Sequence, residues 1–194
     1  IARPAFGTEN VIIGGGAPRD LVSGVPVKDV DVFVQITEAE WEDKEVFKRR
    51  AEVFSSLVNG SITFREPNEV DGYEALFDIC EIVPGARFAS VPLIQVVAIT
   101  EDPIEDVSRY DFGLSQVFVT RSDLFMTEAA SRDRENRTIT YIDLGRSEAA
   151  NIRSAKRLQR LKAKYVEWQF VGCEPLELLL TVLDKVPSAD ILSE

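Results

Sequence analysis

The chain has 194 residues, 45% of them apolar, a formal net charge of −11 at pH 7 and no histidine. This composition is typical of a globular chain with one main core, and no apolar run approaches the length that spans a bilayer. The lack of histidine excludes Ser-His-Asp triads, imidazole zinc sites and histidine general bases, but it leaves carboxylate–Mg²⁺ chemistry open. The two cysteines, Cys80 and Cys173, argue against a disulfide framework and favour a reducing compartment such as the cytoplasm.

A glycine-rich turn follows the first predicted strand. Residues 11–13 are apolar and β-branched, which predicts a strand, and three glycines at 14–16 end it. Pro18 then lies where a helix can begin, with Arg19 in its first turn. Backbone N–H groups at such a turn form an anion site, and the Arg19 guanidinium adds donors for phosphate. The turn therefore predicts a phosphate-binding site.

Two aspartates lie in the second predicted strand, residues 29–34. Side chains alternate across a strand, so the carboxylates of Asp29 and Asp31 share one face. This pair suits Mg²⁺, which takes one or two carboxylates together with substrate phosphates. A GxGxxG fingerprint is absent because its third glycine would fall at Arg19, and a Walker A loop is absent as well. The alternative is that both aspartates are solvated residues at a strand edge.

Helices and strands alternate along the remainder of the chain. Helical spacing of apolar residues predicts a helix at 38–58 that stops at Asn59-Gly60, with Trp41 and the phenylalanines in the core. Strands are predicted at 61–65, 73–83, 92–100, 116–119 and 138–143. Helices are predicted at 103–107, 122–134, 147–168 and 174–185. The order of elements predicts an α+β fold with a mixed sheet flanked by helices.

The segment GGAPRDLVSGVPVKDVDVFV, residues 15–34, carries a family resemblance. It resembles the head-domain signature of class II CCA-adding enzymes and bacterial poly(A) polymerases, in the polymerase β-like nucleotidyltransferase superfamily. The pattern there is GG-x-x-R-D, a short leucine-rich helix with a glycine, then K-D-[IV]-D. The matching residues are Gly15, Gly16, Arg19, Asp20, Leu21, Gly24, Lys28, Asp29 and Asp31. The resemblance implies a nucleotidyltransferase head at residues 1–145 and a short helical neck and tail at 146–194.

The resemblance also implies an activity. Enzymes of this family transfer a nucleoside monophosphate from an NTP to an acceptor hydroxyl and release pyrophosphate. Here Asp29 and Asp31 would be the catalytic residues, and they would hold two Mg²⁺ or Mn²⁺ ions. The residues implied to bind the nucleotide are Gly15, Gly16, Arg19, Lys28, Arg109 and Asp111. The base of the NTP stays open, and so does the acceptor, which is an RNA 3′ end, a protein or a small molecule.

A second segment, DVSRYDFGLSQ at residues 106–116, is similar to the family motif D-L-x-R-R-D-F-T-I-N-A, which closes over the nucleotide. The matching residues are Asp106, Arg109, Asp111, Phe112 and Leu114. The departures are Tyr110, Gly113 and Ser115. The resemblance gives Arg109 and Asp111 a role in positioning the sugar or the phosphates. The alternative is an Arg109–Asp111 ion pair that only braces the fold.

The main departure from the superfamily pattern concerns its third carboxylate. That acid often lies on a neighbouring strand, where this chain offers the uncharged Gln95. Asp78 and Glu81 are the other candidates, but they are three positions apart and so face opposite sides of their strand. The alternative function is therefore a catalytically degenerate nucleotide-sensing, partner-binding or assembly protein with this fold.

Basic residues gather at 146–165. They are Arg146, Arg153, Lys156, Arg157, Arg160, Lys162 and Lys164, against the single acid Glu148. The spacing is similar to the arginine-bearing neck helix of the family, which implies contact of residues 153–164 with an RNA or tRNA-like acceptor. The alternative is a solvated helix, or one paired with the acidic body. The expectation is a minimal, phage-like stand-alone head in the host cytoplasm, with no membrane contact and with a protein partner left open.

Overall fold

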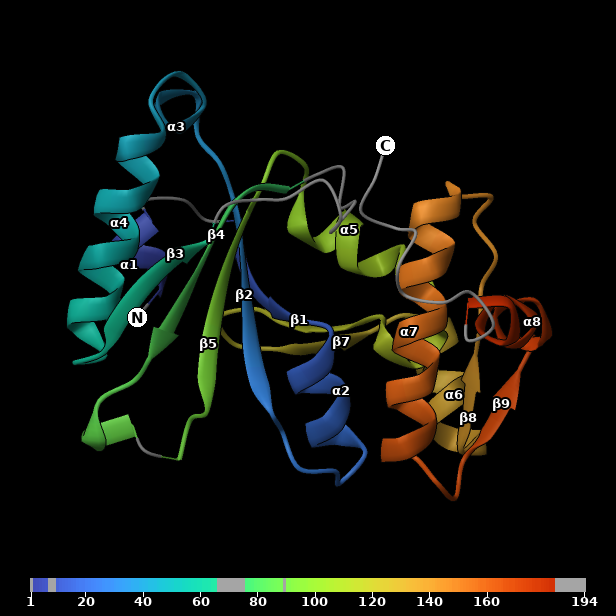
Figure 1. Ribbon diagram of the computed structural model, residues 1–194. Coiled ribbons are helices and arrows are strands. Elements are labelled where there is room, and N and C mark those ends of the chain that lie inside the picture. The colour runs from blue at the N-terminus through green and yellow to red at the C-terminus, as the bar shows by residue number, and fades with distance from the viewer. Residues whose placement is uncertain (1, 7–9, 66–75, 89, 184–194) are drawn as a thin grey trace.

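A seven-stranded mixed sheet runs through the part of the chain that the computed structural model describes, residues 2–6, 10–65, 76–88 and 90–183 (Figure 1). Its strand order is β3-β4-β5-β2-β1-β6-β7. The strands are β1 (Val11–Gly14), β2 (Asp29–Gln35), β3 (Ser61–Arg65), β4 (Leu76–Val83), β5 (Leu93–Ile99), β6 (Val117–Val119) and β7 (Leu124–Met126). Only the central β2–β5 pair is parallel, and the other neighbours are antiparallel.

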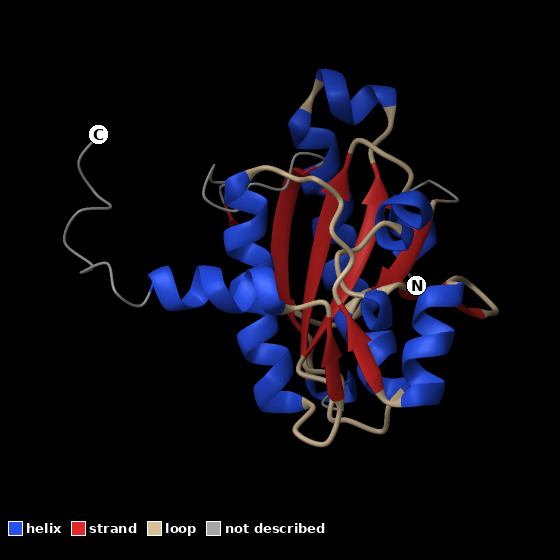
Figure 2. Ribbon diagram, turned by 90° about the vertical axis from the view of Figure 1, so that its right-hand side faces the viewer, coloured by secondary structure: helices blue, strands red, loops and turns tan. Residues whose placement is uncertain are grey.

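Helices cover both faces of this sheet (Figure 1, Figure 2). The helices of the described residues are α1 (Ala2–Phe6), α2 (Gly16–Val22), α3 (Glu38–Glu42), α4 (Lys44–Leu57), α5 (Pro103–Ser108), α6 (Glu128–Asn136), α7 (Glu148–Lys164) and α8 (Glu174–Leu183), of which α1 and α4 lie on one face and α5 on the other. A parallel pair, β8 (Thr138–Thr140) and β9 (Gln169–Val171), forms a separate small sheet. The predicted α+β class is confirmed. Among the described residues, no helix has both the length and the apolar character to cross a membrane.

The central strand β2 presents different residues to its two faces. Val30, Val32 and Val34 pack into a hydrophobic cluster with Phe47 and Phe54 of α4. Figure 1 shows α1 and α4 together on this side of the sheet and α5 on the other. On the other face Phe33 of β2 packs with Val107 of α5, while the start of the strand bears the two aspartates. The alternation expected from the sequence is therefore present, and the aspartates lie opposite the larger core.

A further hydrophobic cluster lies at the C-terminal side of the sheet. Phe112, Leu114 and Ile139 pack there against Leu158 and Leu161 of α7. Because this core combines residues from before and after position 145, the proposed boundary between a head at 1–145 and a neck at 146–194 stays a prediction. Beyond it, α8 projects sideways from the body (Figure 2).

The predicted helix at 38–58 is wrong in one respect, because Asp43 divides it. Asp43 is extended (φ −141°, ψ 102°), and its side chain accepts a hydrogen bond from the Glu45 N–H at the start of α4. The core assignment is confirmed for the phenylalanines of α4 but wrong for Trp41. That side chain is 64% exposed and stacks on Phe77 at 6.0 Å. A local cap thus overrides the helical periodicity.

Three other segments differ from the prediction. Part of the predicted helix 122–134 is strand β7, which pairs with β6, and α6 starts only after the Thr127 cap. The predicted helix 147–168 ends at Lys164, and the unpredicted β9 follows it. The short helix α1 was not predicted either. Residues 73–75 of one predicted strand and 184–185 of the last predicted helix lie outside the described residues.

We expect Leu158→Ala to destabilise the protein by about 2–5 kcal/mol, because this fully buried side chain would leave a cavity in the cluster that it forms with Phe112, Leu114 and Ile139. Urea denaturation should show one transition, since the cluster joins both sides of position 145. Leu178→Ala is the matched control: Leu178 is 68% exposed, so its loss should change stability by less than about 0.5 kcal/mol. Two separate transitions, with only one moved by Leu158→Ala, would contradict this view of the core.

Candidate functional site

A polar row crosses the sheet on the face that carries the aspartates. Asp31 of β2 is in register with Gln95 of β5, which is in register with Glu81 of β4. Directly paired residues share a face, and Asp29 lies two residues before Asp31. The Gln95 side-chain amide donates to Glu81 Oε1 at 3.0 Å. The structure thus brings together both predicted metal ligands and the predicted Gln95.

The two candidates for a third carboxylate are on opposite faces, as expected. Glu81 lies in the polar row, where Arg65 also donates to its Oε1 at 3.0 Å. Asp78 is buried on the other face, where it shares the side of Cys80. Of these two acids, only Glu81 faces the aspartates, and Gln95 stands between them.

Asp31 is electrostatically strained in the absence of a cation. Burial is the main cause that raises the pKa of its carboxyl to about 7, and the negative charge of Asp29 is the second. Arg157 and Arg19 act in the opposite sense and lower it. The arrangement therefore combines two like charges with two nearby guanidinium groups, one from α2 and one from α7.

The glycine turn holds the start of α2 against this pair. Gly15 has a φ of 64°, a left-handed conformation that favours glycine, and its N–H donates to the Val117 carbonyl at 3.1 Å. A Cβ placed on Gly16 would lie 3.8 Å from Arg19 Nη2 and 4.0 Å from Asp29 Oδ1. Gly16 therefore lies close to both the guanidinium and the first aspartate; a phosphate-binding role of the turn stays a prediction.

Arg19 belongs to a buried polar cluster, the Asp20 cluster, that joins α2 to the end of α7. Its members are Arg19, Asp20, Ser115, Lys164 and Tyr165. Arg19 donates through Nε to Asp20 Oδ1 at 2.8 Å and through Nη1 to Ser115 at 3.2 Å. Asp20 is 2% exposed; it also pairs with Lys164 and accepts from the Tyr165 hydroxyl at 2.7 Å. Sequence reasoning assigned no contact to Ser115 or Tyr165, which are 96 and 146 residues from Arg19.

The structure separates the two residues singled out in the second motif. Asp111 is buried and accepts from Arg157 Nη1 at 2.6 Å and from the Ser154 hydroxyl. Arg109 is exposed and pairs instead with Glu101 at 2.7 Å. The predicted alternative, an Arg109–Asp111 ion pair, is therefore wrong. The ion-pair partner of Asp111 is Arg157 of α7. Their role toward a nucleotide stays a prediction.

Arg157 connects α7 to the aspartates. Its guanidinium carbon lies 5.9 Å from the centre of the Tyr110 ring, and that ring packs edge-on against Phe33 of β2. Burial raises the pKa of Tyr110 well above its usual value, so its hydroxyl stays neutral beside Asp31. Position 110, where the family motif has a second arginine, is thus an aromatic support for an arginine from α7.

The basic residues of α7 differ in their surroundings, and Arg153 among them is half-buried. Arg157, Lys162 and Lys164 form ion pairs with acids of the body or of α8. Lys156 and Arg160 are exposed to solvent. Lys28, which precedes β2, is exposed too. About half of the predicted basic face is therefore engaged within the protein.

The donor set of the aspartate pair fits a magnesium ion. Within the described residues there is no group of three or more histidine, cysteine or acidic side chains that could hold a metal. Mg²⁺ does not need one, because it is bound by one or two carboxylates, phosphate oxygens and water. The raised pKa of Asp31 reflects its burial and, second, repulsion by Asp29, and a divalent cation would offset both.

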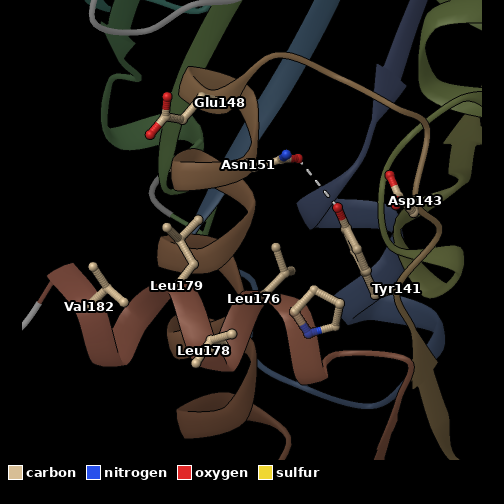
Figure 3. A pocket seen from close by; sticks show the side chains of 9 residues that line it. Tyr141, Asp143, Glu148, Asn151, Leu176, Leu178, Leu179 and Val182 are labelled. Atoms are coloured by element: carbon tan, nitrogen blue, oxygen red, sulfur yellow. Dashed lines mark hydrogen bonds between the residues drawn. The ribbon is translucent and has the colours of Figure 1, made fainter.

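A hollow of about 460 Å³ lies away from this site, between α7, α8 and the loop after β8 (Figure 3). Its walls combine leucines of α8 with Tyr141 and Asn151, whose side chains hydrogen-bond at 3.4 Å. None of the predicted site residues lines it.

Comparisons with known proteins define the fold. No protein-family model matches the sequence, and a search of curated proteins gives no match. Among solved structures, a tRNA-processing enzyme in its apo form matches with a TM-score of 0.58 and 17% identity, over 96% of this chain and 48% of that one. The Thermotoga maritima CCA-adding enzyme complexed with tRNA matches with a TM-score of 0.55 and 17% identity, over 86% of this chain and 36% of that one.

A tRNA nucleotidyltransferase complexed with a primer tRNA and an incoming ATP analog matches with a TM-score of 0.57 and 18% identity, over 91% of this chain and 49% of that one. The chain therefore shares the fold of the part of these enzymes that it covers, and the nucleotidyltransferase-head fold predicted from the sequence is confirmed. It spans less than half the length of each of these three structures.

The raised pKa of Asp31 predicts a pH-dependent stability. The unfolded chain loses this proton near pH 4, whereas the folded protein holds it to about pH 7. The folded state binds the extra proton between these values, so this group makes the protein less stable as the pH rises from about 4 to 7. In urea denaturation without metal ions, the free energy of unfolding of Asp31→Asn relative to that of wild type should therefore rise by about 1–3 kcal/mol from pH 4 to pH 8.

The exposed Asp123 provides the control, because Asp123→Asn should track wild type across the same range. A constant difference between Asp31→Asn and wild type at all pH values would be incompatible with a strained carboxyl at position 31.

Proposed function

We propose that this protein is a metal-dependent nucleotidyltransferase that transfers a nucleoside monophosphate from an NTP to an acceptor hydroxyl. The observation that carries the proposal is the placement of Asp29 and Asp31 on one face of β2, beside the glycine turn and Arg19. The likeness of the fold to enzymes solved with CTP and with ATP supports it.

Different residues of the chain would bind the metal ions and the triphosphate. Asp29 and Asp31 would hold Mg²⁺ or Mn²⁺, which when bound neutralises the phosphates and makes an acceptor hydroxyl more acidic. Gly15, Gly16 and Arg19 would hold the triphosphate: Gly15 shapes the turn, since its own N–H donates to Val117, Gly16 offers its backbone N–H and Arg19 its guanidinium. Lys28 would add a positive charge. Displacement at the α-phosphorus then forms the new phosphodiester bond and releases pyrophosphate, whose charge Arg19 stabilises.

Two residues of the second motif would act beside the phosphates. Asp111 would position the sugar side of the nucleotide through Arg157, to which it is bonded at 2.6 Å. Arg109 would join the site by exchanging its exposed partner Glu101 for the nucleotide. An exposed surface ion pair of this kind is weak, so the exchange costs little.

We further propose an RNA acceptor in the cytoplasm. Lys156 and Arg160 are exposed on α7, one residue before and three after Arg157, and basic side chains in such a row suit a phosphodiester backbone. Structures of similar fold have been solved with tRNA and with a primer tRNA. Both cysteines are buried free thiols, which agrees with a reducing compartment.

The first test is label transfer from α-labelled NTPs to RNA in Mg²⁺. We expect Asp29→Asn and Asp31→Asn each to lower the rate by at least about a hundredfold, because loss of a metal ligand removes several kcal/mol of charge stabilisation. Asp123→Asn, an exposed acid outside the site, should retain the wild-type rate. Transfer that persists in Asp31→Asn would refute the proposed mechanism.

A second candidate function follows from Gln95. The residue in register with Asp31 is an uncharged amide that bonds to Glu81, so the row lacks a third carboxylate next to the pair. Such a site would suit a nucleotide-sensing or partner-binding protein. Saturable NTP binding with no label transfer to RNA, protein or small hydroxyl acceptors would favour this function over the enzyme.

A further inference from the structure

Tyr165 is a member of the Asp20 cluster to which the proposed function gives no role. It caps the C-terminal end of α7 and is 1% exposed. Its hydroxyl donates to Asp20 Oδ1 at 2.7 Å and accepts from Arg19 Nε at 3.2 Å. Its ring also lies against the same arginine, with 5.6 Å between the guanidinium carbon and the ring centre. Tyr165 therefore holds Arg19 by both its polar and its aromatic parts.

The cluster fixes the guanidinium without using all its donors. Arginine has five N–H groups, and the contacts described engage Nε–H and one N–H on each terminal nitrogen. One donor on each terminal nitrogen thus lies outside these contacts. Nη2 is at the glycine turn beside Gly16, and the arginine charge acts on Asp31. The cluster pairs two cations with one carboxylate, so it retains a positive charge for an anion.

We propose that Tyr165 is a positioning residue for the triphosphate, which it orients through Arg19; this inference rests on the proposed function. A free arginine side chain loses rotamer freedom when it binds a ligand, and that loss weakens affinity. The bonds to Tyr165 and Ser115 order the guanidinium before the nucleotide arrives. Burial raises the pKa of Tyr165 to about 12, so its hydroxyl remains protonated and keeps both bonds throughout the assay range.

The test measures binding of tripolyphosphate, which presents the phosphates without base or sugar, to the full chain by calorimetry at low ionic strength. Tyr165→Phe removes the hydroxyl but keeps the ring. We expect affinity to fall about three- to tenfold, the range of one net hydrogen bond. In the nucleotidyl-transfer assay the same variant should raise KM for the NTP by a similar factor and leave kcat nearly unchanged.

A matched control lies in the same region of the fold. Tyr141→Phe removes another tyrosine hydroxyl that bonds to α7, at Asn151, and that makes no described contact with Arg19. It should leave tripolyphosphate affinity and KM at wild-type values. Urea denaturation of both variants checks that each is folded under the assay conditions.

A double-mutant cycle separates positioning from a structural role. Because Tyr165 acts through Arg19, Tyr165→Phe should change affinity less than twofold in an Arg19→Gln background. Equal losses in both backgrounds, or wild-type affinity in Tyr165→Phe alone, would overturn the inference. Wild-type protein that binds tripolyphosphate but transfers no label would contradict the proposed function and leave the inference intact, whereas absence of binding would overturn both.

Discussion

The central position of β2 is the constraint on which the site depends. With β1 on one side and β5 on the other, its backbone is fully committed to the sheet, and its side chains can only alternate. Val30, Val32 and Val34 are required by the core beneath α1 and α4. Their burial places Asp29 and Asp31 together on the opposite face. A shift of one residue would place both carboxylates in the core beneath α1 and α4 and remove the valines from it, so the hydrophobic core itself fixes the orientation of the acids.

Two arginine–carboxylate ion pairs lie around Asp29 and Asp31. Arg19 is bonded to Asp20, and Arg157 is bonded to Asp111, while both arginines act on Asp31. Each guanidinium is thereby supported by its own carboxylate and still acts on Asp31. The site is acidic at its centre and basic at its edges, a distribution suited to a cation between carboxylates and phosphates. It is built from α2 and β2, which follow one another in the sequence, and from α7, which lies near the C-terminal end of the described chain.

Features set by neighbouring residues could be predicted from the sequence. The strand alternation that places Asp29 and Asp31 on one face and the glycine turn before α2 are local patterns, and both are present. The helix expected at 38–58 failed because a single capping aspartate, Asp43, changes the backbone where periodicity continues. The strand β7 was mistaken for helix because its three residues are extended only by pairing with β6.

The contacts that complete the site could not be read from spacing. Asp111 is two residues from Arg109, yet its partner is Arg157, 46 residues later. Gln95 and Glu81 join the row only through the register of three strands, which no local pattern records. The resemblance to nucleotidyltransferase heads identified the turn and the aspartates, because those positions lie within a contiguous signature. It carried no information on Tyr165 and Ser115, whose positions depend on tertiary packing.

The link between Asp20 and the end of α7 has a consequence for any attempt to isolate the first 145 residues. Such a fragment would lack Lys164 and Tyr165, and it would keep a carboxylate that the intact protein shields almost completely from water. It would also uncover the aromatic and aliphatic surface of Phe112 and Leu114. Truncation would therefore impair both the solubility of the fragment and the geometry of its arginine, and catalytic assays on it would underestimate the intact chain.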